Sequence, residues 1–239
     1  MHTIVSRDAA PGFPQDAFDR AYIEAAVKPA KITEPSRAPD VRAEITGAAV
    51  AVVYRHRRAW EAGEELLALA RQQRDDRGRD WHYAAQAALF DFVVSLHSAF
   101  ESSFYGLYFV GAQIRPTGFA HVTGDDTRRS INPKTVTTEY AKQWPGSGLA
   151  IELTAVKDSS FYGELARTRN VLAHRIAPGF EHQVSLEGEA LESATEYDYA
   201  LAWRGEKVEA LVPRMLSGAE GMLDSLWTQV AAFFENAKM

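Results

Sequence analysis

The sequence contains no cysteine among its 239 residues. This absence excludes disulfide bonds, thiol catalysis and zinc sites built from thiolates. The sequence also has no Walker-type Gly-Lys-Ser/Thr loop and no glycine-rich dinucleotide fingerprint. It has no cluster of acidic residues or histidines at metal-ligand spacing, and neither His121 nor His182 has a partner at such a spacing. The sequence therefore indicates no metal site and no cofactor.

Long hydrophobic runs are missing as well. No uninterrupted apolar stretch approaches the roughly 20 residues that a membrane-spanning helix needs, and the first eleven residues have no apolar core of signal-peptide length. We therefore expect a cytoplasmic protein that has no membrane partner. The 26 lysines and arginines are outnumbered by 32 aspartates and glutamates, which gives a net charge of −6. A protein that coats nucleic acid without regard to its sequence would require a positive net charge. An acidic protein can still bind RNA in a local basic cleft.

What the sequence does contain is helical periodicity behind an N-terminal appendage. Several prolines punctuate the first forty residues, and a short helix is predicted over 15–27. We interpret residues 1–40 as an arm with a Pro-rich linker, and we expect the arm to pack on the body or on a partner subunit. Residues 41–239 are interpreted as one helical domain.

Apolar residues at spacings of three and four predict four main helices in this domain. The predicted ranges are 41–74, 79–111, 158–175 and 213–235. Residues 113–157 are predicted to be irregular, apart from a short helix over 134–143 that follows an Asn132–Pro133 cap. Period-two alternation between residues 184 and 209 predicts a small hairpin. The predicted fold class is all-α: an up-and-down helical bundle with an N-terminal arm and a small β-hairpin insertion before the last helix.

The third predicted main helix carries Arg169, Asn170 and His174 within six residues. Arginine supplies a fixed cation, asparagine an amide, and histidine a side chain that exchanges protons near neutral pH. Asn170 and His174 share a helix face, so the amide could hydrogen-bond one ring nitrogen of His174. Arg169 lies about 140° around the helix from His174, so its side chain has to curl toward the histidine or reach a second subunit. Such groups suit the binding of a phosphodiester and proton transfer at it.

This motif and the helices around it resemble the HEPN superfamily, the higher eukaryote and prokaryote nucleotide-binding domains. HEPN domains carry an arginine, usually followed by a polar residue, and then a histidine four to six positions beyond. The resemblance covers the motif and, in architecture, about residues 41–235. It implies a bundle of the HEPN type that forms a homodimer through the motif helix, with one cleft shared by two subunits.

The resemblance also implies metal-independent cleavage of RNA, in which the ribose 2′-OH attacks the neighbouring phosphorus. His174 would then be the general base or acid, and Arg169 would hold the phosphate. Such an endoribonuclease would be a stress, defence or toxin effector, with an antitoxin or another protein as partner. Two alternatives remain. One is a non-catalytic HEPN module that binds nucleotide or RNA or acts as a dimerisation scaffold; the other is a structural domain in which Arg169 and His174 join helices.

Four further residues are candidates for roles near the motif. His97 and Glu101, four residues apart on the second main helix, are either a supporting pair beside the motif or an exposed helical pair. Arg167 and Arg175 flank the motif and are candidates for substrate binding because they raise its positive charge. The alternative for Arg175 is that it interacts only with the helix dipole, which favours a basic residue at a helix C-terminus.

Two basic clusters lie elsewhere in the chain. Arg128 and Arg129 fall in the long segment at 113–157 and are candidates for contacting an RNA backbone, since long segments between elements often carry function. The run at residues 55–58 is the densest in basic residues. Because three glutamates follow it within two turns, an ordinary solvated helix face is the favoured interpretation there.

Overall fold

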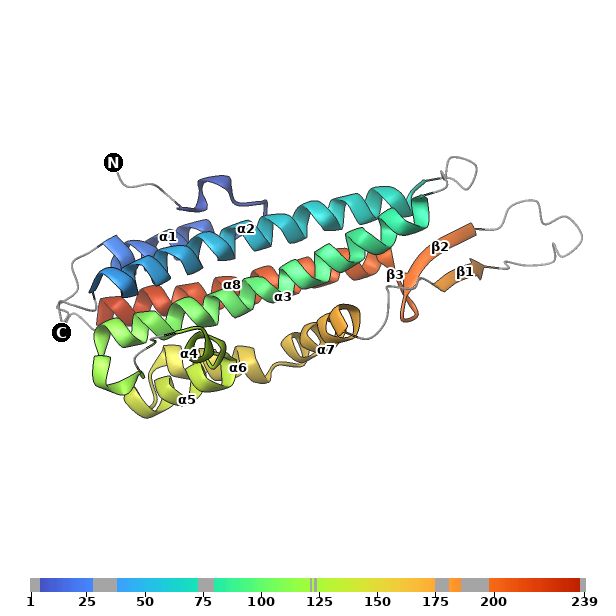
Figure 1. Cartoon of the computed structure of the whole chain (residues 1–239). Coiled ribbons are helices and arrows are strands. Elements are labelled where there is room, and N and C mark those ends of the chain that lie inside the picture. Colours follow the sequence, from blue (N-terminus) through green and yellow to red (C-terminus); the bar gives the residue numbers. More distant parts are fainter. Residues whose placement is uncertain are drawn as a thin grey trace, which may run out of the picture.

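Three long helices lie side by side in the computed structural model and form the centre of the fold (Figure 1). They are α2 (Ala38–Ala70), α3 (Trp81–Ile114) and α8 (Val208–Asn236). α3 is the central element, since apolar side chains are buried along its whole length. Gly106 of α3 faces Ala48 of α2, and a Cβ at Gly106 would come within 2.9 Å of the Ala48 Cβ, so glycine allows the two backbones to approach closely. The structure describes residues 5–27, 38–72, 80–120, 122, 124–174, 181–185 and 198–236.

The predicted helix over residues 15–27 is present in the arm. It consists of α1 (Gln15–Tyr22) and a π-helical turn, η2 (Ile23–Val27), and a short 3-10 helix, η1 (Val5–Asp8), precedes it. α1 packs against α8, where Phe18 is fully buried and meets the ring of Trp227 edge-on at a centroid distance of 4.6 Å. The side chains of the arm therefore contribute to the same core as the long helices.

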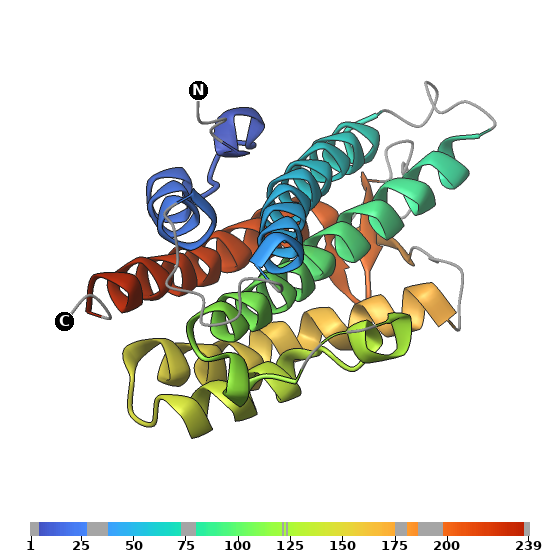
Figure 2. The same cartoon turned by 60° about the vertical axis from the view of Figure 1, so that its left-hand side comes forward.

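Three helices follow α3 on the side of the bundle away from α1 (Figure 2): α4 (Asp125–Arg129), α5 (Pro133–Gln143) and α6 (Gly148–Asp158). The Asn132 cap is confirmed, because its side chain accepts a hydrogen bond of 3.0 Å from the Thr135 backbone N–H. The prediction of an irregular chain is wrong at α4 and at α6. Ser147 caps α6 through a bond from the Ala150 N–H, and the apolar face of this helix is buried.

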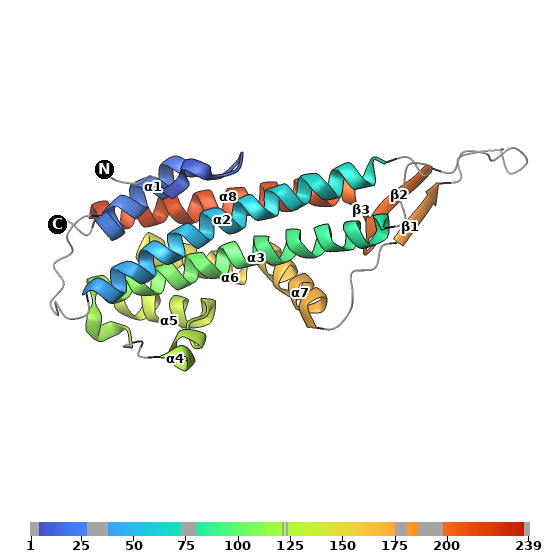
Figure 3. The same ribbon diagram turned by 45° about the horizontal axis from the view of Figure 1, so that its top comes forward.

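α7 (Ser160–His174) comes next and is followed by a small antiparallel sheet. Strands β1 (Glu181–Ser185), β2 (Asp198–Trp203) and β3 (Glu206–Lys207) pair in sequence order. Arg204 and Gly205 both have positive φ, which suits the tight turn between β2 and β3. Figure 3 places the strands at the end of the bundle where α3 and α8 begin.

The predicted small hairpin before the last helix is confirmed, and the molecule is mostly helical, as expected. The last helix begins at Val208, not at residue 213 as predicted, and Pro213 lies inside it. Burial of Val208, Leu211 and Val212 accounts for the earlier start, since packing holds this first turn in place. Within the described ranges, no helix is both long and apolar enough to cross a membrane.

Candidate functional site

The motif residues lie on α7, and the buried face of this helix determines where they point. The Ser159 hydroxyl accepts a 3.0 Å hydrogen bond from the Tyr162 backbone N–H and so caps the start of the helix. Four side chains at helical spacing form the face that packs on the bundle: Tyr162, Leu165, Thr168 and Leu172. Arg169 follows Thr168 and is half-buried at the edge of this face.

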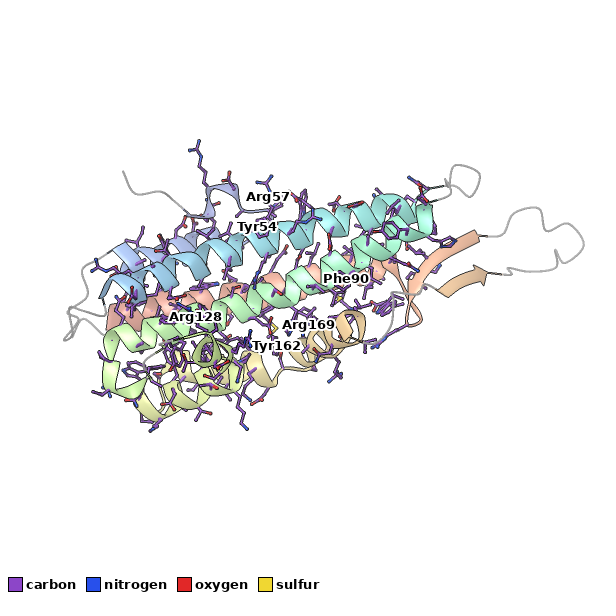
Figure 4. All side chains as sticks on the ribbon, viewed as in Figure 1. Tyr54, Arg57, Phe90, Arg128, Tyr162 and Arg169 are labelled. Carbon is purple, nitrogen blue, oxygen red and sulfur yellow. The ribbon has the colours of Figure 1, made fainter. Side chains whose placement is uncertain are left out.

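Arg169 approaches α3 from α7. Figure 4 shows its side chain and that of Tyr162 between these two helices. The Arg169 Nη1 donates a 3.0 Å hydrogen bond to the Asn170 Oδ1. The Arg169 Nε is buried and has no hydrogen-bond partner in the described part of the chain. A buried N–H group without a partner is costly, so this nitrogen marks a place where a ligand oxygen would be favourable.

His97 and Glu101 of α3 meet α7 at the same place. The His97 Nδ1 lies 3.5 Å from the Glu101 Oε2, and the His97 ring stacks on Tyr162 with a centroid distance of 5.5 Å. His97 is only 5% exposed, so the interpretation of the two residues as an exposed pair is wrong for the histidine. The side chain of Glu101 remains 42% exposed to solvent.

Burial and the charges in this cluster shift the pKa values of two titratable groups. The neighbouring His97 imidazole lowers the pKa of Glu101; partial burial opposes this effect, and the charges of Arg169 and Arg55 add to it. Burial raises the pKa of Tyr162 to about 12, and the negative charge of Glu101 acts in the same direction. Glu101 is therefore an ionised carboxylate at neutral pH, whereas Tyr162 is a neutral phenol.

Arg55 of α2, which the sequence analysis assigned to a solvated helix face, instead bonds to α3 next to this cluster. Its Nη1 donates to the Ser102 hydroxyl at 2.7 Å and to the Ser98 carbonyl at 3.0 Å. Both serines belong to α3, and Ser98 and Ser102 lie next to His97 and Glu101 in sequence. The sequence contains a weak signal, since Ser98 and Ser102 are four residues apart and therefore share one face of α3.

The remaining motif residues are only partly within the described chain. Asn170 and Arg167 are exposed on α7. The amide oxygen of Asn170 binds Arg169, whereas the side chain of His174, its predicted partner, lies outside the described residues. His174 is the last residue of α7, and Arg175 falls outside the described residues altogether.

The other predicted substrate-binding residues, Arg128 and Arg129, lie on α4. Arg128 pairs with Glu44 of α2 at 2.9 Å and lines a surface cavity of about 510 Å³ with it. Arg129 is 80% exposed and lies 3.9 Å from Asp126. Figure 4 places Arg128 away from Arg169, so the structure does not bring Arg128 to the motif cluster.

Among the described residues, no three histidine, aspartate or glutamate side chains converge as they would around a metal ion. No family model, curated protein or solved structure matches the chain. What the site can do therefore follows from its own side chains. Two guanidinium groups can bind an anion, and an imidazole beside a carboxylate can exchange a proton.

Proposed function

We propose that this protein is a metal-independent endoribonuclease of the HEPN type, in the role of a stress, defence or toxin effector. One observation carries the proposal: Arg169 of the motif helix is near enough to the His97–Glu101 pair of α3 to act on the charge of Glu101, and its buried Nε has no hydrogen-bond partner among the described residues. Titratable groups and a cation that converge between two helices form the kind of polar cluster expected of a catalytic site. The resemblance of the Arg169–His174 motif to HEPN domains supports the choice of RNA as substrate.

In the proposed reaction the ribose 2′-oxygen attacks the adjacent phosphorus. A base accepts the 2′ proton, the bond from phosphorus to the 5′-oxygen breaks, and an acid donates a proton to the departing 5′-oxygen. The products are a 2′,3′-cyclic phosphate and a 5′-hydroxyl end. His174 is assigned proton transfer, and Arg169 binds the phosphate oxygens on which negative charge develops. His97 and Glu101 support the site electrostatically, by setting the local charge near Arg169.

A homodimer through α7 completes the proposal. α7 lies at the edge of the molecule (Figures 1 and 3), and Arg167, Asn170 and Ala173 are exposed on it. Two copies that meet along this helix would place two motifs in one cleft, so that base and acid need not be the same residue. An antitoxin that covers this face is the corresponding protein partner.

The test is cleavage of RNA in excess chelator by the wild-type protein, His174→Ala and Arg169→Ala. We expect the wild type to leave cyclic-phosphate ends, and we expect both variants to lose cleavage while they remain folded by circular dichroism. Arg71→Ala is the matched control, because Arg71 is an exposed arginine just after α2. Absence of cleavage by the wild-type protein, or unchanged cleavage by the Arg169 variant, would contradict the proposal.

A second candidate function is a non-catalytic module that binds nucleotide or RNA or that serves as a dimerisation scaffold. It is favoured by the neutralisation of basic groups elsewhere on the molecule, since Arg58 pairs with Asp91 and Arg128 pairs with Glu44. This function predicts that the wild-type protein binds RNA without cutting it. Filter binding and the cleavage assay on the same samples separate the two functions.

A further inference from the structure

Glu101 lies on a stretch of α3 that two other helices contact. Arg55 of α2 donates hydrogen bonds to Ser98 and Ser102 of this stretch. Tyr162 of α7 stacks on its His97. Arg55 belongs to α2 and Arg169 to α7, and both are close enough to Glu101 to lower its pKa, after the larger effect of His97. Two guanidinium groups against one carboxylate leave a local excess of one positive charge. The carboxylate is also accessible, since the side chain of Glu101 is 42% exposed.

Neither arginine is fully occupied by the hydrogen bonds of this cluster. A guanidinium has five N–H donors. Arg55 uses its Nη1 for Ser98 and Ser102 of α3, which hold the group in a fixed position. Arg169 uses its Nη1 for Asn170, and its Nε is a buried donor to which no described residue offers an acceptor. The cluster therefore combines spare donors with excess positive charge, and a tetrahedral oxyanion satisfies both.

We propose that Arg55 and Arg169 form one binding site for a phosphate group, in which Glu101 is a resident carboxylate that competes with the ligand. The proposal rests on the proposed ribonuclease function, in which the ligand is a phosphate of the RNA backbone. It adds Arg55 as a second phosphate-binding residue. In this proposal Glu101 weakens anion binding, because its carboxylate repels a bound phosphate.

A purely structural cluster would behave differently. If Glu101 only joined α2, α3 and α7 through its charge, removal of that charge would weaken the fold and leave anion affinity unchanged. If Glu101 competes with a ligand, removal of the charge strengthens anion binding. The two outcomes differ in sign, so one substitution separates them.

The experiment measures binding of inorganic phosphate to the wild-type protein and to Glu101→Gln, from the shifts of the arginine Nε–H signals in NMR spectra. Chloride at the same ionic strength is the reference. We expect Glu101→Gln to bind phosphate at least about fivefold more tightly than the wild type. In the Glu101→Gln background, a further Arg55→Gln or Arg169→Gln substitution is expected to abolish this gain.

Glu61→Gln is the matched control, since Glu61 is also a carboxylate beside two arginines, Arg57 and Arg58, but lies on α2 away from α7. We expect it to leave phosphate affinity at the wild-type value. Should Glu101→Gln fail to fold, Glu101→Ser removes the same charge and replaces it in the series. Equal phosphate affinity in the wild type and the Glu101 variant, or a gain that survives loss of Arg55, would overturn the proposal.

Inorganic phosphate is not a substrate, so this experiment is separate from the cleavage assay. If the protein binds phosphate as expected but never cuts RNA, the ribonuclease proposal is wrong and the phosphate-site proposal is supported. A protein that cuts RNA but shows no effect of Glu101 on phosphate affinity keeps the ribonuclease proposal and loses this one.

Discussion

The imidazole of His97 stacks on the phenol ring of Tyr162, with ring centroids 5.5 Å apart and an angle of 18° between the ring planes. His97 belongs to α3 and Tyr162 to α7, so this contact holds the motif helix against the centre of the bundle. Tyr162 also meets Phe100 edge-on. The position of Arg169, two turns further along α7, depends on this anchor.

The first prediction concerns that anchor. Tyr162→Leu removes the stacking and part of the buried volume, so we expect it to lower the free energy of unfolding by about 2 kcal/mol. Tyr162→Phe keeps the ring and is expected to cost less than about 1 kcal/mol. Urea unfolding measures both. Equal losses in the two variants would show that the ring contact with His97 contributes nothing.

The second prediction concerns alkaline pH. Burial raises the pKa of both Tyr162 and Tyr105 to about 12, from an ordinary value of 10.0. Between these values the unfolded chain loses the phenol proton before the folded protein does. The contribution of these phenols to the free energy of unfolding is therefore fully present below pH 10 and is lost as the pH rises to 12. For Tyr162 we expect the loss to be about 2 kcal/mol.

Urea unfolding at a series of alkaline pH values, with the ultraviolet absorbance of phenolate as a second signal, measures this loss. Tyr162→Phe cannot titrate and should lose less stability across that range. Tyr83→Phe is the control, because Tyr83 is 75% exposed. A Tyr162→Phe profile that follows the wild type would contradict the assignment.

The third prediction concerns acid. His56 is fully buried beside Phe13, neither of its ring nitrogens has a hydrogen-bond partner among the described residues, and burial lowers its pKa from 6.5 to about 4. As the pH falls from 6.5 to 4, the unfolded chain binds a proton that the folded protein does not. We expect a loss of up to about 3 kcal/mol in the free energy of unfolding.

His56→Leu should remove this acid dependence and leave stability at neutral pH unchanged or higher, since it replaces an unpartnered polar group by an apolar one. Thermal unfolding between pH 7 and pH 4 measures the effect. His82→Gln changes an exposed histidine and serves as the control. Parallel profiles for the wild type and His56→Leu would rule out His56 as the source of the acid dependence.

The helices of the site could be predicted, because a helix that packs on a core repeats apolar residues at spacings of three and four. Apolar spacing predicted ranges of 79–111 and 158–175, close to the observed α3 and α7. The helix α6 also had its signal, in the spacing of Leu149, Leu153 and Val156, but the neighbouring glycines indicated a turn. Gly146 does form that turn with a positive φ, whereas Gly148 is the first residue of the helix.

The side-chain contacts of the site were not predictable to the same degree. His97 and Tyr162 are far apart in sequence, so their stacking depends on how α7 docks on α3, which no local pattern contains. The basic run at residues 55–58 was interpreted from its charge as a solvated face. Helical spacing, however, places His56 on the buried face of α2, because it follows the buried Val52 by four residues and Val53 by three.

The fourth prediction compares two helical glycines. A Cβ at Gly111 of α3 would overlap the ring of Phe119, which is buried. In the part of the chain that the structure describes, nothing lies within 4 Å of a Cβ at Gly47 of α2. We expect Gly111→Ala to destabilise the protein by about 1–3 kcal/mol through overpacking. Gly47→Ala should stabilise it by about 0.5–1 kcal/mol, because alanine is the better helix former. Changes of the same sign in urea unfolding would contradict this packing.

The fifth prediction concerns the geometry of the motif arginine. Arg169→Lys keeps the charge but loses the planar fork and the Nε donor, so we expect RNA cleavage to fall about 10²-fold under single-turnover conditions. Arg71→Lys is the matched control, since Arg71 is an exposed arginine just after α2, and it should stay within about threefold of the wild type. If the two lysine variants cut RNA at the same rate, Arg169 acts only through its charge, and the assignment of its donors to the phosphate is wrong.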